Sequence, residues 1–299
     1  MKIGFIGLGR MGFNIVLNLH DKKVPVVAYN RSPEPANQIK KYGIDAAFSV
    51  EELLNKLPKQ KIIWIMVTAG KPVDAVIEEL VPYLKKDDII IDGGNSFYKD
   101  SVRRYKFLKS RKIHFVDIGT SGGLKGARHG ACLTIGGDKK TFKKIEWVCK
   151  AASAKNGYAY VGNAGAGHFV KIVHNGIEYS MLQAYGDGFE LLSKGPYKNL
   201  DLGKIAETWQ NGSVIRSWLI ELAANAFKKD GNLSKIEGVV GGGETGQWAV
   251  NIAKEHKVQF ESVRLALKLR KKSRKIPTFS GKVIAALRNE FGGHEVVKK

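Results

Sequence analysis

The spacing of the apolar residues changes once along this chain, near residue 160, and that change constrains the fold more than any other feature. Before it, short apolar runs alternate with amphipathic segments, which cover residues 10–20, 72–84 and 98–110. After it, the apolar residues recur only at helical spacing. Strands that alternate with helices form a parallel sheet with helices on both faces. We therefore expect a doubly wound α/β domain at 1–163 and an all-helical domain at 164–299.

The first predicted strand, KIGFI, runs directly into the glycine-rich turn GLGRMG. The spacing is GxGxxG, and a helical pattern follows it. Glycines there permit a tight turn and let backbone amides approach a pyrophosphate at the helix N-terminus. A tight turn without a ligand is the alternative. We expect a dinucleotide site with contacts from Gly7, Leu8, Gly9, Arg10, Met11 and Gly12.

The second predicted strand, PVVAY, ends in Asn30-Arg31-Ser32. NAD enzymes carry an acidic residue near this position for the ribose hydroxyls, and none is present here. A carboxylate would repel a 2′-phosphate, whereas a guanidinium with neighbouring amide and hydroxyl groups can bind one. We therefore expect NADP to be favoured over NAD, with Asn30, Arg31 and Ser32 as cofactor contacts. The alternative is that Arg31 simply begins a surface helix.

The composition bears on the partners. The net charge is +21, from 49 Lys+Arg and 28 Asp+Glu, but the excess is spread over both parts of the chain and forms no tail. Such a distribution fits anionic small molecules or a solvated surface better than nucleic acid. No apolar run reaches the ~18 residues of a membrane span, and Cys132 and Cys149 lack the spacing of a zinc or redox site. We expect a cytoplasmic protein with no nucleic-acid, membrane or metal partner.

Two more glycine-rich segments follow predicted strands. DGGNS at 92–96 follows DDIII, and TSGGLKGARHG at 120–130 follows KIHFVDI. Open α/β sheets bind ligands at the carboxyl ends of their strands. Each segment alone could be a turn, but two at the edge that holds the cofactor favour a substrate site.

The segment KIVHNGIEYS combines an apolar face with a polar one. If it is helical, Lys171, His174, Asn175 and Glu178 share one face. Lys171 and Glu178 are about 10 Å apart along the axis, too far for an ordinary helical ion pair. They could instead reach two ends of a small polyol acid. For His174 alone, a hydrogen-bonded structural histidine is the alternative.

These motifs together resemble the 6-phosphogluconate dehydrogenase family, within the β-hydroxyacid dehydrogenases. GLGRMG, DGGNS, TSGG, GAGHFVKIVHNGIEY and RNEFGGH occur in the family's order from Met1 to about His294. The length, GACLTIGG and the terminal ALRNEFGGH are similar to the family's short form. The resemblance implies a Rossmann-type domain followed by a helical substrate and dimerisation domain. It also implies the oxidative decarboxylation of 6-phosphogluconate to ribulose 5-phosphate and CO2, with reduction of NAD(P) and without a metal.

The resemblance further implies roles for individual residues. The lysine matching Lys171 is the general base for the C3 hydroxyl, and the glutamate matching Glu178 protonates C1 of the enediol. The substrate contacts that it implies are Asn95, Ser121, Gly122, Gly123, His174, Asn175, Tyr179, Thr245, Arg270, Arg288 and His294. Of these, Tyr179, Thr245, Arg270 and Arg288 would surround the phosphate. Met11 would lie against the nicotinamide, and the further cofactor contacts would be Val67, Thr68, Ala69 and Asn95. In the family, the residues matching Arg288 and His294 come from the neighbouring subunit, which implies at least a homodimer.

The chain departs from the family pattern at several positions. Gly243 stands where the long form has a lysine, Leu124-Lys125 replaces an acidic pair, and Pro35 stands where NADP-using members carry a lysine. Many short-form members prefer NAD, which opposes the expectation drawn from Arg31.

Two alternatives remain. Another β-hydroxyacid dehydrogenase, such as one acting on 3-hydroxyisobutyrate, would not need Glu178, Arg288 or His294. A non-catalytic nucleotide-binding or nucleic-acid-binding protein would not need Lys171 and Glu178.

Overall fold

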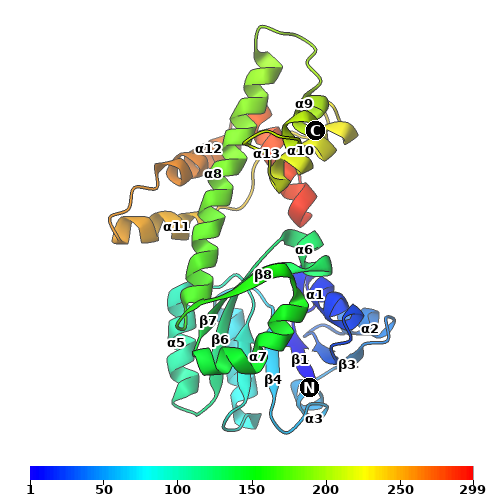
Figure 1. Cartoon of the computed structure of the whole chain (residues 1–299), viewed down its shortest axis with the longest axis vertical. Helices are drawn as coiled ribbons and strands as arrows, with labels where there is room; N and C mark the ends of the chain where they lie inside the picture. The colour runs from blue at the N-terminus through cyan, green and yellow to red at the C-terminus, as the bar shows by residue number, and fades with distance from the viewer. Residues whose placement is uncertain (299) are drawn as a thin grey trace. The chain divides into compact units, whose positions relative to one another are not determined.

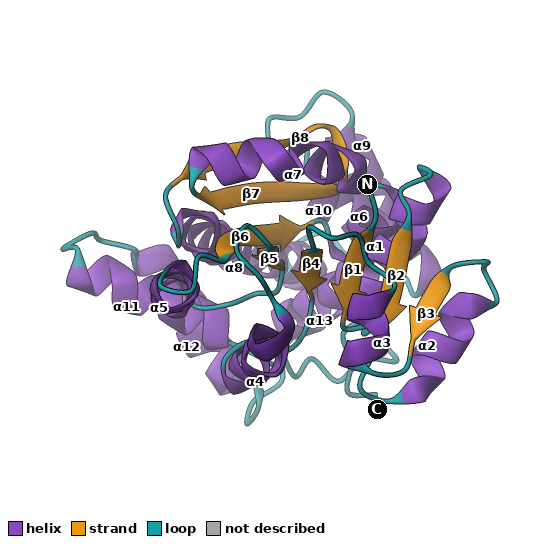
Figure 2. Ribbon diagram, turned by 90° about the horizontal axis from the view of Figure 1, so that it is seen from below, coloured by secondary structure: helices purple, strands orange, loops and turns teal. Residues whose placement is uncertain are grey.

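An eight-stranded sheet organises the first of two units in this computed structural model, which describes residues 1–298. The first unit is Met1–Lys171, and the second begins at Ile172. The strands are β1 (Ile3–Ile6), β2 (Val26–Tyr29), β3 (Asp45–Ala47), β4 (Ile62–Ile65), β5 (Ile89–Asp92), β6 (His114–Ser121), β7 (Ala131–Gly137) and β8 (Ser153–Gly162). Their order in the sheet is β3-β2-β1-β4-β5-β6-β7-β8 (Figure 2). All neighbours are parallel except β6 and β7.

Helices cover both faces of this sheet. One face packs against α1 (Arg10–Asp21), α2 (Pro33–Lys40), α6 (Gly123–His129) and α7 (Lys139–Ala152). The other packs against α3 (Val50–Asn55), α4 (Lys71–Leu80) and α5 (Tyr98–Lys109), with a 3₁₀ turn at Val81–Tyr83. The predicted doubly wound fold is confirmed.

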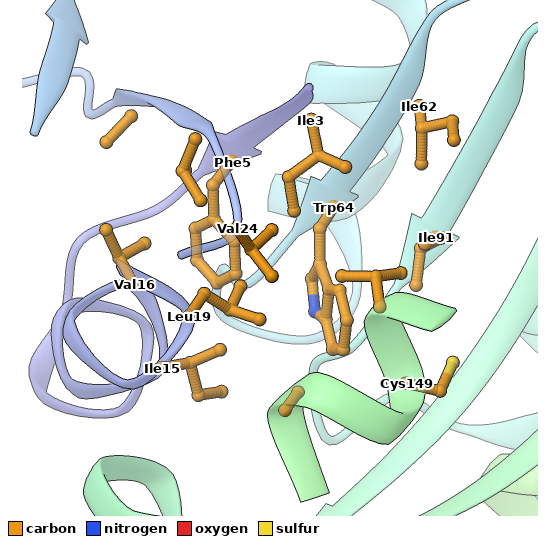
Figure 3. Close-up of a cluster of buried hydrophobic side chains, with 14 of the residues drawn as sticks. Ile3, Phe5, Ile15, Val16, Leu19, Val24, Ile62, Trp64, Ile91 and Cys149 are labelled. Atoms are coloured by element: carbon orange, nitrogen blue, oxygen red, sulfur yellow. The ribbon is translucent and has the colours of Figure 1, made fainter. Parts of the chain in front are cut away.

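The first face buries the larger of the two cores beside the sheet. Phe5 of β1 and Trp64 of β4 stack with their ring centres 6.0 Å apart, and Ile15 and Leu19 of α1 lie nearby (Figure 3). Strands β1, β4 and β5 are buried along their whole length. Parallel strands that are covered on both faces read as continuous apolar runs, which is why these three were visible in the sequence.

The strand order reverses direction between β1 and β4. Successive strands β1, β2 and β3 extend to one side, and β4 returns to pair with β1 on the other side. Such a switch point leaves a crevice outside the carboxyl ends of the two strands, where open α/β sheets bind their ligands. The turn that begins at Gly7 and the loop that follows β4 both start there.

The second unit is helical. α8 (Ala166–Lys194) begins in the first unit and continues into the second, as the long green helix in Figure 1. It is followed by α9 (Leu202–Gln210), α10 (Trp218–Lys229), α11 (Glu244–Glu255), α12 (Glu261–Ser273) and α13 (Phe279–Gly292). Phe189 of α8, Phe227 of α10 and Leu287 of α13 share its core. Within residues 172–298 the one β-type pairing is an isolated bridge between Ile236 and Lys298, so the predicted all-helical part is confirmed.

No helix within residues 1–298 combines the length and the apolar character that crossing a membrane would need.

Candidate active site

The glycines of the first turn are there for two different reasons. Gly7 has φ +103°, and a Cβ on it would lie 2.3 Å from the Met66 carbonyl oxygen. A Cβ on Gly12 would lie 2.0 Å from the Gly7 carbonyl oxygen. The fold itself therefore requires Gly7 and Gly12. A Cβ on Gly9 would meet nothing within 4 Å, so Gly9 leaves space beside the turn that a ligand can fill.

That space lies at the N-terminus of α1, which suits an anion. Gly9 is the N-cap, no side chain caps the helix, and its first turn contains no acidic residue. The first amides of a helix lack intrahelical acceptors, and its dipole is positive at this end. A pyrophosphate fits both properties, so the predicted turn can hold NAD(P). Met11 packs partly against the core, and Arg10 is exposed.

The side chain of Asn30 ties this turn to the end of β2. Its Oδ1 accepts from the Leu8 amide at 2.9 Å, and its Nδ2 donates to the carbonyl and the hydroxyl of Ser32 at 3.0 and 2.9 Å. Asn30 therefore has a structural task beside the cofactor contact predicted for it. Arg31 and Ser32 are exposed at the same loop.

The loops that follow β4, β5 and β6 lie against one another. A Cβ on Gly94 would lie 3.0 Å from the Val67 carbonyl oxygen, and the Thr120 hydroxyl donates to the Gly93 carbonyl at 3.0 Å. Asn95 is exposed, between the buried Gly94 and Ser96. Thr68 is also exposed, whereas Val67 and Ala69 are partly buried. The structure thus brings the predicted residues of these three loops to one edge of the sheet.

Lys171 lies at this edge, although it belongs to α8. Its Nζ donates to the Ser121 hydroxyl at 2.6 Å, and the two residues are 9% and 8% exposed. A Cβ on Gly119 would lie 2.5 Å from the Lys171 Cβ, so only a glycine in β6 admits the helix so close. Gly122 and Gly123, at φ +113° and +57°, follow Ser121 into α6. The amine predicted to be the base and the predicted SGG loop are therefore in contact.

Asp117, which the sequence analysis missed, fixes the start of α8. Its carboxylate accepts from the amides of Gly165 and His168 at 2.6 and 2.9 Å. Burial raises the pKa of Asp117, while the charge of His168 and the two amide donors act in the opposite direction. The sequence does carry a signal for Asp117, because this aspartate interrupts the apolar run KIHFVDI.

In the second unit, the predicted phosphate residues form a cluster of their own. The guanidinium carbon of Arg270 lies 3.9 Å from the centre of the Tyr179 ring, and the hydroxyls of Tyr179 and Thr245 are 3.4 Å apart. Burial lowers the pKa of both Arg270 and Arg288, and the charge of Arg288 lowers the pKa of Arg270 further. Nη1 of Arg270 is buried without a hydrogen-bond partner. Two desolvated cations and an unused donor favour an anion.

A glycine loop completes this cluster. A Cβ on Gly242 would lie 3.2 Å from Nη2 of Arg288. Gly243 is the N-cap of α11 at φ +138°, a conformation that a lysine would rarely adopt, and no side chain caps the helix. The helix amides therefore stand where the long form of the family has a lysine. Arg288 lies near enough to Arg270 of the same chain for its charge to act on it, and a contribution of Arg288 from the neighbouring subunit, which the resemblance implies, stays a prediction.

The remaining predicted residues of α8 lie close to one another. His174 Nδ1 is 3.3 Å from Asn175 Oδ1 and 4.0 Å from Glu178 Oε2. The side chains of His174 and Glu178 are 47% and 26% exposed, and both can reach a ligand.

His294 lies just after the end of α13. Its ring packs edge-on to Phe291, with the ring centres 5.9 Å apart, and its Nε2 lies 2.7 Å from a Cβ placed on Gly292.

The described residues contain no group of three or more His, Cys, Asp or Glu side chains that could hold a metal ion.

Comparison with known proteins gives the family. Residues 2–162 match the family model described as the NAD binding domain of 6-phosphogluconate dehydrogenase, and residues 167–278 match the C-terminal domain of 6-phosphogluconate dehydrogenase. YqeC of Bacillus subtilis, provisionally named as a 6-phosphogluconate dehydrogenase, is 44% identical over 100% of both chains. The NAD(+)-dependent, decarboxylating 6-phosphogluconate dehydrogenase of Haloferax volcanii is 43% identical, over 100% of this chain and 99% of its own.

A solved structure agrees with these matches. This chain is similar to the 6-phosphogluconate dehydrogenase of Plasmodium falciparum, with a TM-score of 0.84 and 32% identity. The match covers 91% of this chain and 62% of that longer chain. A 3-hydroxyisobutyrate dehydrogenase of Salmonella typhimurium, at 17% identity and TM-score 0.77, shares the fold. The full-length identities and the two family models show that this chain belongs to the 6-phosphogluconate dehydrogenase family.

Proposed function

We propose that this protein oxidises and decarboxylates 6-phosphogluconate to ribulose 5-phosphate and CO2 while NAD(P) is reduced. The observation that carries the proposal is the contact of 2.6 Å between Lys171 Nζ and Ser121 Oγ at the glycine-lined edge of the sheet. A largely buried amine at the carboxyl ends of the strands is placed for proton transfer to a ligand that lies beside the nicotinamide.

Lys171 acts as the base in the first step. When bound, the nicotinamide supplies a hydride acceptor. The C3 hydroxyl proton passes to the neutral amine of Lys171 while the hydride leaves C3, so that C3 becomes a carbonyl. The ammonium of Lys171 then gives this proton to the carbonyl oxygen as the C1–C2 bond breaks, CO2 departs and an enediol forms. The neutral amine takes the proton back when the ketose forms. Ser121 holds the amine in position between these steps.

Glu178 supplies the proton that completes the reaction. After loss of CO2, a five-carbon enediol remains, and its C1 must gain a proton to give the ketose. A carboxylic acid on α8, two helical turns from Lys171, is suited to that transfer. His174 and Asn175 bind the hydroxyls of the sugar acid, with Asn95, Gly122 and Gly123.

The arginine cluster binds the phosphate of the substrate. Arg270, Arg288, Tyr179 and Thr245, with the amides at the start of α11, form an environment for a dianion. This cluster favours 6-phosphogluconate over 3-hydroxyisobutyrate, which carries no phosphate to neutralise two buried cations. His294 is a further phosphate contact in this proposal.

For the cofactor, we propose a preference for NADP over NAD. Arg31 is exposed beside the turn at Gly9, and no carboxylate stands in the segment Asn30-Arg31-Ser32 to repel a 2′-phosphate. The Haloferax volcanii relative is named as NAD(+)-dependent, so both cofactors must be measured.

The cytoplasmic location expected from the sequence also stays a prediction.

We also propose a homodimer, because α8 carries an exposed apolar stripe. Its members recur at spacings of three and four residues, as at a helix-to-helix contact, and they are Ile177, Met181, Ala184, Gly188 and Leu191. A second copy of α8 would cover this stripe.

The deciding experiment is a spectrophotometric assay of 6-phosphogluconate with NADP and with NAD, with CO2 and ribulose 5-phosphate measured as products. We expect turnover with stoichiometric CO2, and a higher kcat/KM with NADP than with NAD. Turnover of 3-hydroxyisobutyrate without CO2 would replace this proposal with the related dehydrogenase. Polynucleotide binding that weakens steeply with salt, without any turnover, would replace it with the non-catalytic alternative.

A further inference from the structure

Arg104 of α5 is a fully buried cation that neither the proposed chemistry nor the cofactor contacts use. Its side chain is 1% exposed, and three of its nitrogens have partners. Nε donates to Asp74 Oδ1 at 2.8 Å, Nη1 donates to Asp92 Oδ2 at 3.2 Å, and Nη2 donates to the Gly70 carbonyl at 3.0 Å. Burying a guanidinium is costly unless its donors are satisfied. Here the partners lie in or beside two different loops, the one that follows β4 and the one that follows β5.

The first of these loops is the one predicted to lie beside the nicotinamide. Gly70 ends the segment Val67-Thr68-Ala69 and caps α4, at φ +87°. The bond from Arg104 Nη2 to the Gly70 carbonyl fixes the end of this segment. Asp74, one turn into α4, accepts the bond from Nε. Arg104 therefore holds both the loop and the helix that follows it.

The second loop is the one that presents Asn95. Asp92 is 0% exposed and, besides Arg104, accepts from the Ser96 hydroxyl at 2.8 Å and from the Gly94 amide at 3.2 Å. These bonds close the loop on both sides of the exposed Asn95. Asp92 is thus the link through which Arg104 fixes the position of Asn95.

We infer that Arg104 is a positioning residue that clamps these two loops together, and so sets the distance between the nicotinamide and the reacting carbon of the substrate. The inference rests on the proposed function. The two loops are in direct contact, because a Cβ on Gly94 would lie 3.0 Å from the Val67 carbonyl oxygen. A guanidinium can donate in three directions within one plane, whereas an ammonium on a flexible stem cannot reproduce that fork.

The neighbouring Arg103 provides a matched control. Its Nη2 donates to Asp74 Oδ2 at 2.8 Å, so it shares one carboxylate with Arg104, but its side chain is 55% exposed and its other carboxylate contact is Asp100. Arg103→Lys and Arg104→Lys both keep the charge. Only Arg104→Lys removes the bridge between the two loops.

The experiment compares these variants in the full chain, with kcat, the KM values and the primary isotope effect on 3-deuterated 6-phosphogluconate. Misplacing reacting groups by about 1 Å can lower a rate on the order of a hundredfold. We expect Arg104→Lys to lower kcat by roughly ten- to a hundredfold and to raise the isotope effect, since hydride transfer becomes more rate-limiting. The KM for the cofactor should change little, because the turn at Gly9 is untouched. Arg103→Lys should match the wild type.

Two outcomes would overturn the inference. In the first, Arg104→Lys lowers kcat only in proportion to the fraction of unfolded protein and leaves the isotope effect unchanged. In the second, Arg103→Lys gives the same loss. If Arg104→Lys does not fold, Ser96→Ala removes one bond of the same network. For Ser96→Ala we expect a smaller fall in kcat and a raised isotope effect. Wild-type values of both in this variant would refute the inference.

A separate measurement distinguishes failure of the clamp from failure of the proposed function. If the wild type does not turn over 6-phosphogluconate, the proposed function fails. The clamp is then tested by amide hydrogen exchange, which Arg104→Lys should accelerate in residues 67–70 and 92–96 while Arg103→Lys does not. Equal exchange in the two variants would refute it.

Discussion

The guanidinium of Arg270, on α12, lies over the ring of Tyr179, on α8, with 3.9 Å between the guanidinium carbon and the ring centre. The ring face is electron-rich and attracts a cation, and Nη1 of the same guanidinium is buried without a hydrogen-bond partner. Arg270 is only 5% exposed. The protein thus keeps a desolvated donor beside an aromatic ring, an arrangement that suits an anion.

Replacing Arg270 by methionine should raise the KM for 6-phosphogluconate by about ten- to a hundredfold, since a hydrogen bond to a charged group contributes about 1.5–3 kcal/mol. The KM for the cofactor should stay near the wild-type value. Arg264→Met is the matched control. Arg264 is on the same helix, its side chain is 57% exposed, and it forms a surface ion pair with Glu261. Equal effects of the two substitutions would argue against a phosphate site at Arg270.

Lys171→Met keeps an unbranched side chain that is one atom shorter and removes the amine. We expect kcat to fall by a factor on the order of 10² to 10⁴, while the dissociation constant of the cofactor, measured by calorimetry, is unchanged. The Lys171 amine donates to Ser121 at the end of β6, whereas the glycine turn follows β1, which is why cofactor binding should survive. A variant with near wild-type turnover would remove Lys171 from the chemistry.

Glu178→Gln should impair the overall reaction less completely than Lys171→Met, because in the proposed mechanism Glu178 acts after the hydride has been transferred. Incorporation of solvent deuterium at C1 of ribulose 5-phosphate should lose its stereospecificity, since the enediol would then be protonated from water. Unchanged rate and unchanged stereospecificity in this variant would rule out Glu178 as the acid.

The two glycines Gly9 and Gly12 should respond to alanine in opposite ways. A Cβ on Gly9 meets no protein atom within 4 Å, whereas a Cβ on Gly12 would lie 2.0 Å from the Gly7 carbonyl oxygen. Gly9→Ala should therefore keep the melting temperature and weaken cofactor binding. Gly12→Ala should lower the free energy of unfolding by about 1–3 kcal/mol, as overpacking does. If Gly9→Ala bound the cofactor normally, the open space beside the turn would not be the pyrophosphate site.

The stability of the first unit should depend on pH through Asp74. Burial by itself would raise the pKa of Asp74, but the hydrogen bonds from Arg104 and Arg103 outweigh it and hold the pKa below 3.8. A depressed pKa in the folded state stabilises the fold above the unfolded pKa, and this stabilisation is lost as the pH falls through the folded pKa. Asp74→Asn should therefore be less stable than the wild type at neutral pH, by on the order of 1–3 kcal/mol.

The difference between Asp74→Asn and the wild type should narrow in denaturant titrations below about pH 4. Asp100→Asn serves as the control, because Asp100 pairs with Arg103 at 3.4 Å near the surface, where ion pairs contribute little. A difference that does not depend on pH would show that Asp74 does not stabilise the fold through its charge.

The amino-acid sequence by itself determined the local part of this structure. Buried parallel strands are continuous apolar runs, so β1, β4, β5 and much of β6 could be predicted, and the GxGxxG spacing fixed the turn at Gly7. The edge elements were harder to see. β3 has three residues, β7 ends in two glycines, and β8 contains glycine and exposed polar residues, so the apolar signal on which strand prediction depends is weak there. The antiparallel pairing of β6 with β7 has no local signature either.

Tertiary structure alone decided which side chains meet. Lys171 and Ser121 are 50 residues apart in sequence, and their contact depends on Gly119 and on the carboxylate of Asp117 at the start of α8. Arg104 appears in the sequence as one of two adjacent arginines, 103 and 104, yet one is buried between two loops and the other is exposed. Local sequence determines whether each segment forms a strand, a helix or a turn. Burial, together with the cost of leaving a buried donor without an acceptor, decides which segments then meet.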